Sequence, residues 1–189
     1  MGKRSYWLLK TEPGEWSWDD QHRSDGGVSR WDGVRNRQAQ KNLKSMKVGD
    51  LCFFYHSGRE RSIIGVVEVA RAWYSTFGDG GKDWEGAVDV RMVAEMQRSV
   101  NLKEIKAAAA EMKDFALLRQ PRLSVIPVAE RIWDRVCEMG GGYAGSSEDG
   151  NGGEEEGRNE DASGDGSYFF ISNGLILSAN KLISTVDLE

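Results

Sequence analysis

The sequence contains few of the residues that build disulfide frameworks and metal sites. Its 189 residues include two cysteines, Cys52 and Cys137, and two histidines, His22 and His56. Two cysteines make no disulfide framework, and together with two histidines they do not supply the ligand set of a zinc site. Because both cysteines lie in apolar runs, we expect buried, reduced thiols, as in proteins of a reducing compartment. We expect neither a metal nor a cofactor.

The sequence also lacks a long hydrophobic run. No segment offers the ~18–20 apolar residues of a membrane-spanning helix, and the N-terminus has no apolar signal-peptide region. The start MGKRSY carries Tyr6 where a myristoylation signal has Ser or Thr. We therefore expect a soluble, intracellular protein with no membrane partner.

Motifs typical of enzymes are absent as well. The sequence contains no G-x-S-x-G elbow and no Walker loop. His56 and Ser57 are adjacent on an expected strand, so their side chains point to opposite faces and cannot act as a base–nucleophile pair. The carboxylates are scattered over positions expected on the surface. We therefore expect that the protein is not an enzyme.

Charge is distributed unevenly along the chain, whose formal net charge is −5. Residues 1–142 hold 23 Lys and Arg against 20 Asp and Glu, a net of +3. Residues 143–189 hold 2 against 10, a net of −8. The overall acidity therefore belongs to the C-terminal part, and the mildly basic remainder is compatible with a nucleic-acid partner.

Composition also predicts where the folded domain ends. From Gly140 to Gly166 almost every residue is Gly, Ser, Asn, Asp or Glu, and such a segment cannot bury enough apolar surface to offset the entropy of ordering it. We predict a domain over residues 1–142 and a disordered acidic, Gly-rich linker over residues 143–167. A short apolar segment of unknown role follows over residues 168–189.

Within residues 1–142, patterns typical of strands and helices alternate. The runs LCFFYHS and IIGVVEVARAW surround GRER and predict a hairpin. The expected strands are residues 6–10, 51–57, 63–73 and 87–96 and a short strand after Arg122. The expected helices are residues 34–46, residues 101–112 and a segment with Pro127 near its start and Gly140 just past its end. This mixture predicts a small α+β domain around a partly closed barrel.

One segment of the domain has basic residues but no acidic ones. Between Asp32 and Asp50 there are five cations: Arg35, Arg37, Lys41, Lys44 and Lys47. Four amide side chains accompany them: Asn36, Gln38, Gln40 and Asn42. Cations can bind phosphates and amides can pair with base edges, while an exposed indole of Trp31 could stack on a base. The alternative for the basic segment is a helix face that only contacts solvent. The alternative for Trp31 is a structural role in which it fills the end of the barrel.

Further polar and aromatic residues lie at the edges of the expected elements. The run FYHSGRER contains Arg59 and Arg61, and the run LLRQPRLSV contains three polar residues: Arg119, Gln120 and Arg122. Three tryptophans lie in apolar patterns and are expected in the core: Trp7, Trp73 and Trp133. Because Trp16 and Trp18 alternate, we expect one of them to pack inward.

The order of these pieces resembles the EVE domain, a member of the PUA-like superfamily. Six blocks match in order over about residues 5–142: YWLLKTEP, WDGVRNRQA with MKVGD, FFYHS, IIGVVEV, VDVR and LLRQPRLSV. The resemblance implies a distorted β-barrel with surrounding helices and a pocket for a single base. EVE domains are similar in fold to YTH domains, which read methylated adenine in an aromatic cage, and are regarded as readers of modified bases.

The matching blocks imply which residues form the site. The implied base pocket contains Lys10, Thr11, Glu12, Trp31, Asn36, Tyr55, His56, Ser57, Arg119 and Gln120. The implied contacts to the nucleic-acid backbone are Arg35, Arg37, Lys41, Arg59 and Arg122. Two positions depart from the family pattern: Thr11 stands where many relatives have Ser, and Pro121 replaces a small polar residue.

The expected function is therefore to bind nucleic acid that carries a modified base, 5-hydroxymethylcytosine or 5-methylcytosine in DNA. The alternative is an RNA-associated or protein-interaction adaptor without modified-base specificity. A less favoured alternative is a nucleotide-processing enzyme that uses Glu12 and His56. We expect a monomer in the nucleus, with the cytoplasm as the other possibility because the sequence has no dense Lys/Arg run.

Overall fold

The fold is described from a computed structural model that defines residues 3–79 and 82–144. Apart from Tyr143 and Ala144, the predicted acidic linker and the apolar segment 168–189 lie outside these residues. Tyr143 is buried, contacts Trp133 edge-on and forms an isolated β-bridge with Met96. The packed part of the chain therefore includes Tyr143, one residue beyond the predicted domain boundary.

A mixed six-stranded sheet forms the centre of the described residues, in the order β2-β5-β4-β3-β1-β6. Only β1 and β3 pair in parallel; the other neighbours are antiparallel. The strands are β1 (Tyr6–Thr11), β2 (Val28–Trp31), β3 (Leu51–His56), β4 (Ser62–Ser75), β5 (Gly86–Asn101) and β6 (Val125–Val128). The α-helices are α1 (Trp18–Arg23), α2 (Arg37–Ser45), α3 (Leu102–Ala107), α4 (Ala116–Arg119) and α5 (Glu130–Gly140). The predicted α+β class is confirmed.

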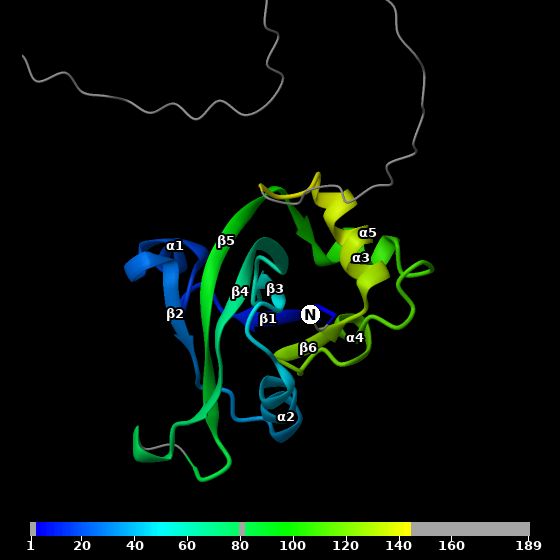
Figure 1. Ribbon diagram of the computed structural model, residues 1–189. Coiled ribbons are helices and arrows are strands. Elements are labelled where there is room, and N and C mark those ends of the chain that lie inside the picture. The colour runs from blue at the N-terminus through cyan, green and yellow to red at the C-terminus, as the bar shows by residue number, and fades with distance from the viewer. Residues whose placement is uncertain (1–2, 80–81, 145–189) are drawn as a thin grey trace, which may run out of the picture. The chain divides into compact units, whose positions relative to one another are not determined.

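The long strands β4 and β5 pair irregularly. Their register shifts four times along the pair, and such irregularities bend strands and increase their twist. In Figure 1, α1 and β2 lie on one side of β5, and α3 and α5 lie on the other. Bending of this kind is what the predicted distorted barrel requires. Its closure remains a prediction, because β2 and β6 are the two edges of the sheet.

Several expected elements agree with the structure. The predicted hairpin is the antiparallel pair β3–β4, and β1 and α2 lie within one to three residues of their expected bounds. The predicted helix over residues 101–112 is wrong beyond Ala107, where the chain continues in turns that bury Met112 and Phe115. Pro127 lies in the edge strand β6 rather than in a helix, which is where a residue without an N–H is tolerated.

The core is built on stacked aromatic rings and one buried carboxylate. The Trp133 and Phe53 rings stack with centroids 3.8 Å apart. Asp50 is 3% exposed and accepts hydrogen bonds from the Trp7 indole at 2.9 Å and from two backbone amides. Trp7 and Trp133 are buried as predicted, whereas Trp73 is only half-buried. No helix within residues 3–79 and 82–144 is long and apolar enough to cross a membrane.

Candidate nucleic-acid interface

A cleft of about 400 Å³ opens where the ends of β1 and β2 meet the loop before α2. We call it the base cleft. Its lining comprises Lys10, Thr11, Glu15, Trp16, Arg30, Trp31, Asp32, Gly33, Val34, Arg35 and Ser124. Two indoles, two carboxylates, three cations and two hydroxyls thus surround a space of the size that proteins use for small ligands.

Trp31 lines the base cleft, but it is not the exposed indole that the sequence predicts. Trp31 is 6% exposed. It is covered because β2 pairs with β5, where Trp31 lies opposite Val88, and because the rings of Trp31 and Phe54 pack edge-on with their centroids 5.6 Å apart. The sequence expectation failed because a polar neighbourhood along the chain does not show what packs there from other strands. Trp31 therefore offers a fixed edge of the cleft rather than a free stacking surface.

Trp16, which the sequence did not place in the site, is the more accessible indole of the base cleft. It is half-buried, and its Nε1–H donates to Gln21 Oε1 at 3.1 Å. Gln21 is fully buried in α1, accepts from Ser29 Oγ at 2.6 Å and donates to the Gly27 carbonyl at 2.8 Å. One buried amide thus fixes the indole relative to the segment that leads into β2.

The turn after β1 holds Trp16 from the other side. The Glu12 carbonyl accepts from the backbone amides of Glu15 and Trp16, both at 2.9 Å. The Thr11 hydroxyl donates to the Trp16 carbonyl at 3.1 Å. This is the TEPGE turn of the sequence, and it positions the Glu15 carboxylate at the cleft. In contrast, the exposed Glu12 side chain does not line the cleft.

Lys10 also lines the base cleft. Its Nζ donates to the Pro121 carbonyl at 3.0 Å and lies 6.0 Å from the centroid of the Tyr55 ring. Burial lowers the pKa of Lys10 from 10.5 to about 8. Lys10 is therefore a cation near neutral pH that loses its charge in mildly alkaline solution.

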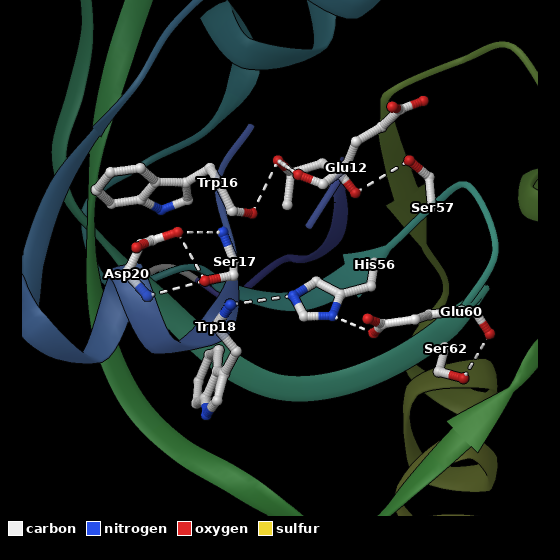
Figure 2. A network of polar contacts seen from close by, with 10 residues as sticks. Glu12, Trp16, Ser17, Trp18, Asp20, His56, Ser57, Glu60 and Ser62 are labelled. Atoms are coloured by element: carbon white, nitrogen blue, oxygen red, sulfur yellow. Dashed lines mark hydrogen bonds and ion pairs between the residues drawn. The ribbon is translucent and has the colours of Figure 1, made fainter. Parts of the chain in front are cut away.

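His56 is buried and both ring nitrogens are engaged. Its Nε2 accepts the Trp18 backbone N–H at 3.0 Å, and its Nδ1 lies 2.6 Å from Glu60 Oε2. Figure 2 shows this series of contacts from Trp18 through His56 to Glu60, of which Glu12 is not a member. A histidine with no free nitrogen does not suit the general-base role in the less favoured enzyme alternative. Its place in this network is to hold the start of α1 against the end of β3.

Comparison with protein families matches residues 5–139 to the EVE domain. The chain belongs to the EVE domain family. Human thymocyte nuclear protein 1 is 29% identical over 165 residues, covering 71% of this chain and 73% of the relative. The zebrafish (Danio rerio) protein of the same name is 30% identical over 167 residues, covering 71% of each.

Solved structures share this fold. Protein Atu2648 of Agrobacterium tumefaciens is 40% identical with a TM-score of 0.69, covering 73% of this chain and 94% of that one. The crystal structure of human THYN1 in complex with DNA containing 5-methylcytosine is 29% identical with a TM-score of 0.68. It covers 72% of this chain and 97% of that chain.

Two further clefts of this EVE domain contain other predicted site residues. A middle cleft of about 290 Å³ is lined by Lys10, Tyr55, Ser57, Gly58, Arg61, Leu102, Lys106, Leu117 and Pro121. A basic cleft of about 610 Å³ is lined by Arg59, Glu60, Arg61, Ser62, Asn101, Leu102, Lys103 and Lys106. The predicted pocket residues are therefore spread over several surfaces rather than gathered in one.

Several residues expected to read or hold the nucleic acid line none of these three clefts. Asn36 caps α2 by accepting the Ala39 N–H, and Arg119 lies 3.7 Å from Asp114. Gln120 and Arg122 are exposed beside the middle cleft residue Pro121. Among the residues that the structure describes, no group of three or more His, Cys, Asp or Glu side chains could hold a metal ion.

The amides and cations of α2 are mostly used within the fold. Gln40 is buried and donates to the carbonyls of Val34 and Gly86, and Asn42 donates to the Val125 carbonyl. The Arg37 guanidinium lies 4.9 Å from the Trp84 ring centroid. The expectation that Gln40 and Asn42 are available to a base edge is therefore wrong. The roles of Arg35, Arg37 and Lys41 as phosphate contacts remain predictions.

Proposed function

We propose that this EVE domain is a DNA-binding module that accommodates one modified cytosine in the base cleft. The observation that carries the proposal is the THYN1 structure, which is similar in fold and contains DNA with 5-methylcytosine. In support, the base cleft has an indole on each of two lining segments, Trp16 and Trp31, and polar side chains between them. We propose 5-methylcytosine as the first ligand and 5-hydroxymethylcytosine as the second.

The side chains of the base cleft match the chemistry of a cytosine. Trp16 can stack on the ring, which contributes ~1–3 kcal/mol per base. The Glu15 carboxylate is exposed and has no salt-bridge partner among the described residues. It can therefore accept a hydrogen bond from the exocyclic amine of a cytosine. Lys10 and Ser124 can donate to the ring nitrogen and the carbonyl oxygen. Val34 supplies an apolar contact for a 5-methyl group, whose burial is worth ~0.8 kcal/mol.

A base can enter this cleft only if it leaves the stack. Extruding a base costs a few kcal/mol, and least when the base is unpaired or mismatched. We therefore expect single strands and mismatched duplexes to bind more tightly than a fully paired duplex.

The proposal is tested by equilibrium titration of the full chain with fluorescent oligonucleotides that differ at one base: cytosine, 5-methylcytosine, 5-hydroxymethylcytosine or thymine. Thymine shares the 5-methyl group of 5-methylcytosine but has a carbonyl in place of the amine. We expect 5-methylcytosine to bind several-fold tighter than cytosine. Glu15→Ala should lower the ratio of the affinity for 5-methylcytosine to that for thymine, because the carboxylate that accepts the hydrogen bond from the cytosine amine is removed.

Trp16→Ala tests the stacking surface. Loss of ~1–3 kcal/mol corresponds to roughly 5- to 150-fold weaker binding. The control is Trp84→Ala, since Trp84 is also half-buried but lines none of the three clefts. Because its ring contacts Arg37, the two variants are compared by the ratio of the affinities for 5-methylcytosine and cytosine rather than by affinity alone. Equal binding of all bases, with indifference to Trp16→Ala, would refute base reading and favour the adaptor alternative. A preference for the same base in RNA over DNA would move the proposal to RNA.

Two further parts of the proposal concern location in the cell and catalysis. The curated relatives bear the name thymocyte nuclear protein 1, and we propose a nuclear protein. The proposal assigns no catalytic step: no histidine lines the base cleft, and both ring nitrogens of the buried His56 are engaged elsewhere. Localisation of a tagged full chain by microscopy tests the first point.

A further inference from the structure

The three clefts adjoin one another through shared lining residues, and we call this series the track. The base cleft and the middle cleft share Lys10. The middle cleft and the basic cleft share Arg61, Leu102 and Lys106. Because each shared residue lines both neighbours, the clefts lie in series, so that a chain molecule leaving the base cleft past Lys10 would meet the middle cleft and then the basic cleft.

Positive charge accumulates along this track. The middle and basic clefts have five cations in their lining, Lys10, Arg59, Arg61, Lys103 and Lys106, against one carboxylate, that of Glu60. The Glu60 carboxylate is already in contact with His56. Within the described parts of the chain, none of the five cations has a carboxylate within salt-bridge distance.

About half of the other cations in the described part of the domain are paired with a carboxylate. Arg91 pairs with Glu68, Arg98 with Glu104, and Arg131 and Arg135 with acidic side chains of their own. Most of the unpaired cations gather in two places: on this track, and along the acid-free segment at α2, where Arg35, Arg37, Lys41, Lys44 and Lys47 also have no carboxylate partner among the described residues. On the track they line clefts. An extended polyanion is the ligand that such a cluster complements.

The backbone at Arg61 gives a second, independent indication. Arg61 has φ 48, and it is the one described residue other than glycine with a positive φ. A side chain other than glycine rarely adopts this conformation, and residues held there are concentrated at functional sites. Here the conformation is maintained by the Leu102 N–H, which donates to the Arg61 carbonyl at 2.7 Å, and by Arg61 Nε, which donates to the Gly58 carbonyl at 3.0 Å. The result is an arginine aimed at both clefts.

We propose that the nucleic-acid strand on one side of the inserted base follows this track. Its phosphates contact Arg61, Lys106 and Lys103, and the apolar lining of the middle cleft, which includes Leu102 and Leu117, takes the sugars and bases between them. This inference rests on the proposed function, because the base cleft fixes where the strand begins. It makes α3 and the β3–β4 turn a phosphate-binding surface beside the exposed face of α2.

The test uses the full chain and single-stranded DNA with one 5-methylcytosine. The oligonucleotides carry a flank of several nucleotides on the 5′ side only, on the 3′ side only, or on both. The variants are Lys106→Ala and Arg61→Gly, with Lys113→Ala as the control, since Lys113 is exposed, has no carboxylate partner among the described residues and lines none of the clefts. Each affinity is measured at several salt concentrations, and each variant is checked by thermal unfolding.

The strand-path proposal predicts an effect that depends on one flank. Lys106→Ala and Arg61→Gly should weaken binding about 3- to 10-fold at low salt for one flank polarity and leave the other polarity unchanged. Each should reduce the slope of log affinity against log salt by about 0.7, the value for one phosphate contact on a single strand. The ratio between 5-methylcytosine and cytosine should remain that of the wild type. Arg61→Gly should unfold at no lower temperature than the wild type, because glycine tolerates the positive φ.

The outcomes separate this inference from the proposed function. If the wild type prefers 5-methylcytosine but both variants keep wild-type affinity and salt dependence, the track is refuted and the base cleft stands. Equal weakening for both flanks also refutes it, since the cations would then act as a general field. If the variants lose affinity for one flank while no base is preferred, the track stands and base reading falls. If no oligonucleotide binds, both fall.

Discussion

The buried amide of Gln21 gives the sharpest link between folding and the base cleft. Replacing Gln21 by Met keeps the volume and shape of the side chain but removes three hydrogen bonds, to Trp16 Nε1, Ser29 Oγ and the Gly27 carbonyl. Each bond contributes ~0.5–1.5 kcal/mol. Because Trp16 and Gly27 are half-buried, water can replace part of the loss there, whereas Ser29 at 9% exposure is left largely without a partner.

We therefore expect Gln21→Met to lower the free energy of unfolding by about 2–4 kcal/mol. For a domain of this size that corresponds to a decrease in Tm of roughly 4–16 °C. Urea denaturation followed by tryptophan fluorescence measures the free energy, and oligonucleotide titration at a temperature where the variant is folded measures base preference. The margin for 5-methylcytosine over cytosine should narrow, because the indole of Trp16 is no longer fixed.

Gln38→Met is the matched control, since Gln38 is an exposed glutamine on α2 that bonds only to Asn42. Its effect on stability should stay within ~0.5 kcal/mol. If Gln21→Met is as stable as Gln38→Met, the amide does not hold the segment together as described. If it is destabilised but retains the full margin for the modified base, the position of Trp16 does not depend on Gln21.

Three further predictions concern packing, pH and charge. Gly65→Ala should destabilise by ~1–3 kcal/mol, because a Cβ there lies 2.3 Å from the Trp18 ring, whereas Gly14→Ala, with nothing within 4 Å, should be near neutral in the same denaturation assay. Oligonucleotide titrations between pH 7 and 9 should show the affinity for DNA falling with rising pH, because Lys10 loses its proton with a pKa of about 8. Stability should instead rise towards pH 10.5, because the unfolded chain binds the proton more tightly, and both trends should be smaller in Lys10→Met. Replacing the glutamates at 154–156 by glutamine should tighten non-specific binding if the acidic segment competes with nucleic acid, and unchanged affinity at low salt would contradict this.

Elements whose signals are local were predictable. The hairpin β3–β4 is short-range, and its first strand is buried at every position, so a continuous apolar run identifies it. The helix α2 begins at a cap supplied by Asn36. In contrast, α1 and β2 are short and have no clear periodicity, and the local signal of α1 is confined to its start, where Ser17 and Asp20 form a capping box. They are held by hydrogen bonds from Gln21 and by pairing of β2 with β5, which no pattern between residues 18 and 31 reveals.

The site was harder to predict because the role of a polar side chain depends on its partner. Gln40 and Asn42 fit a base-reading pattern in sequence, yet their amides bond to carbonyls 46 and 83 residues away. Trp31 stands in a polar run, yet Phe54 covers it. Trp16 carried no such signal, since alternation with Trp18 showed only that one of the two packs inward, and that one is Trp18.

The sequence by itself determined the α+β class, the central hairpin and the positions of basic clusters at element edges, because each depends on residues close together in the chain. The order of six short blocks along the chain determined the family. Only the tertiary structure decided which of them meet. Pairing of β1 with β3 sets Lys10 opposite Tyr55, and the backbone N–H of Lys10 donates to the carbonyl of Ser124 beside β6. This one lysine therefore lines two clefts. That register is chosen by the burial of the whole sheet, and no local pattern contains it.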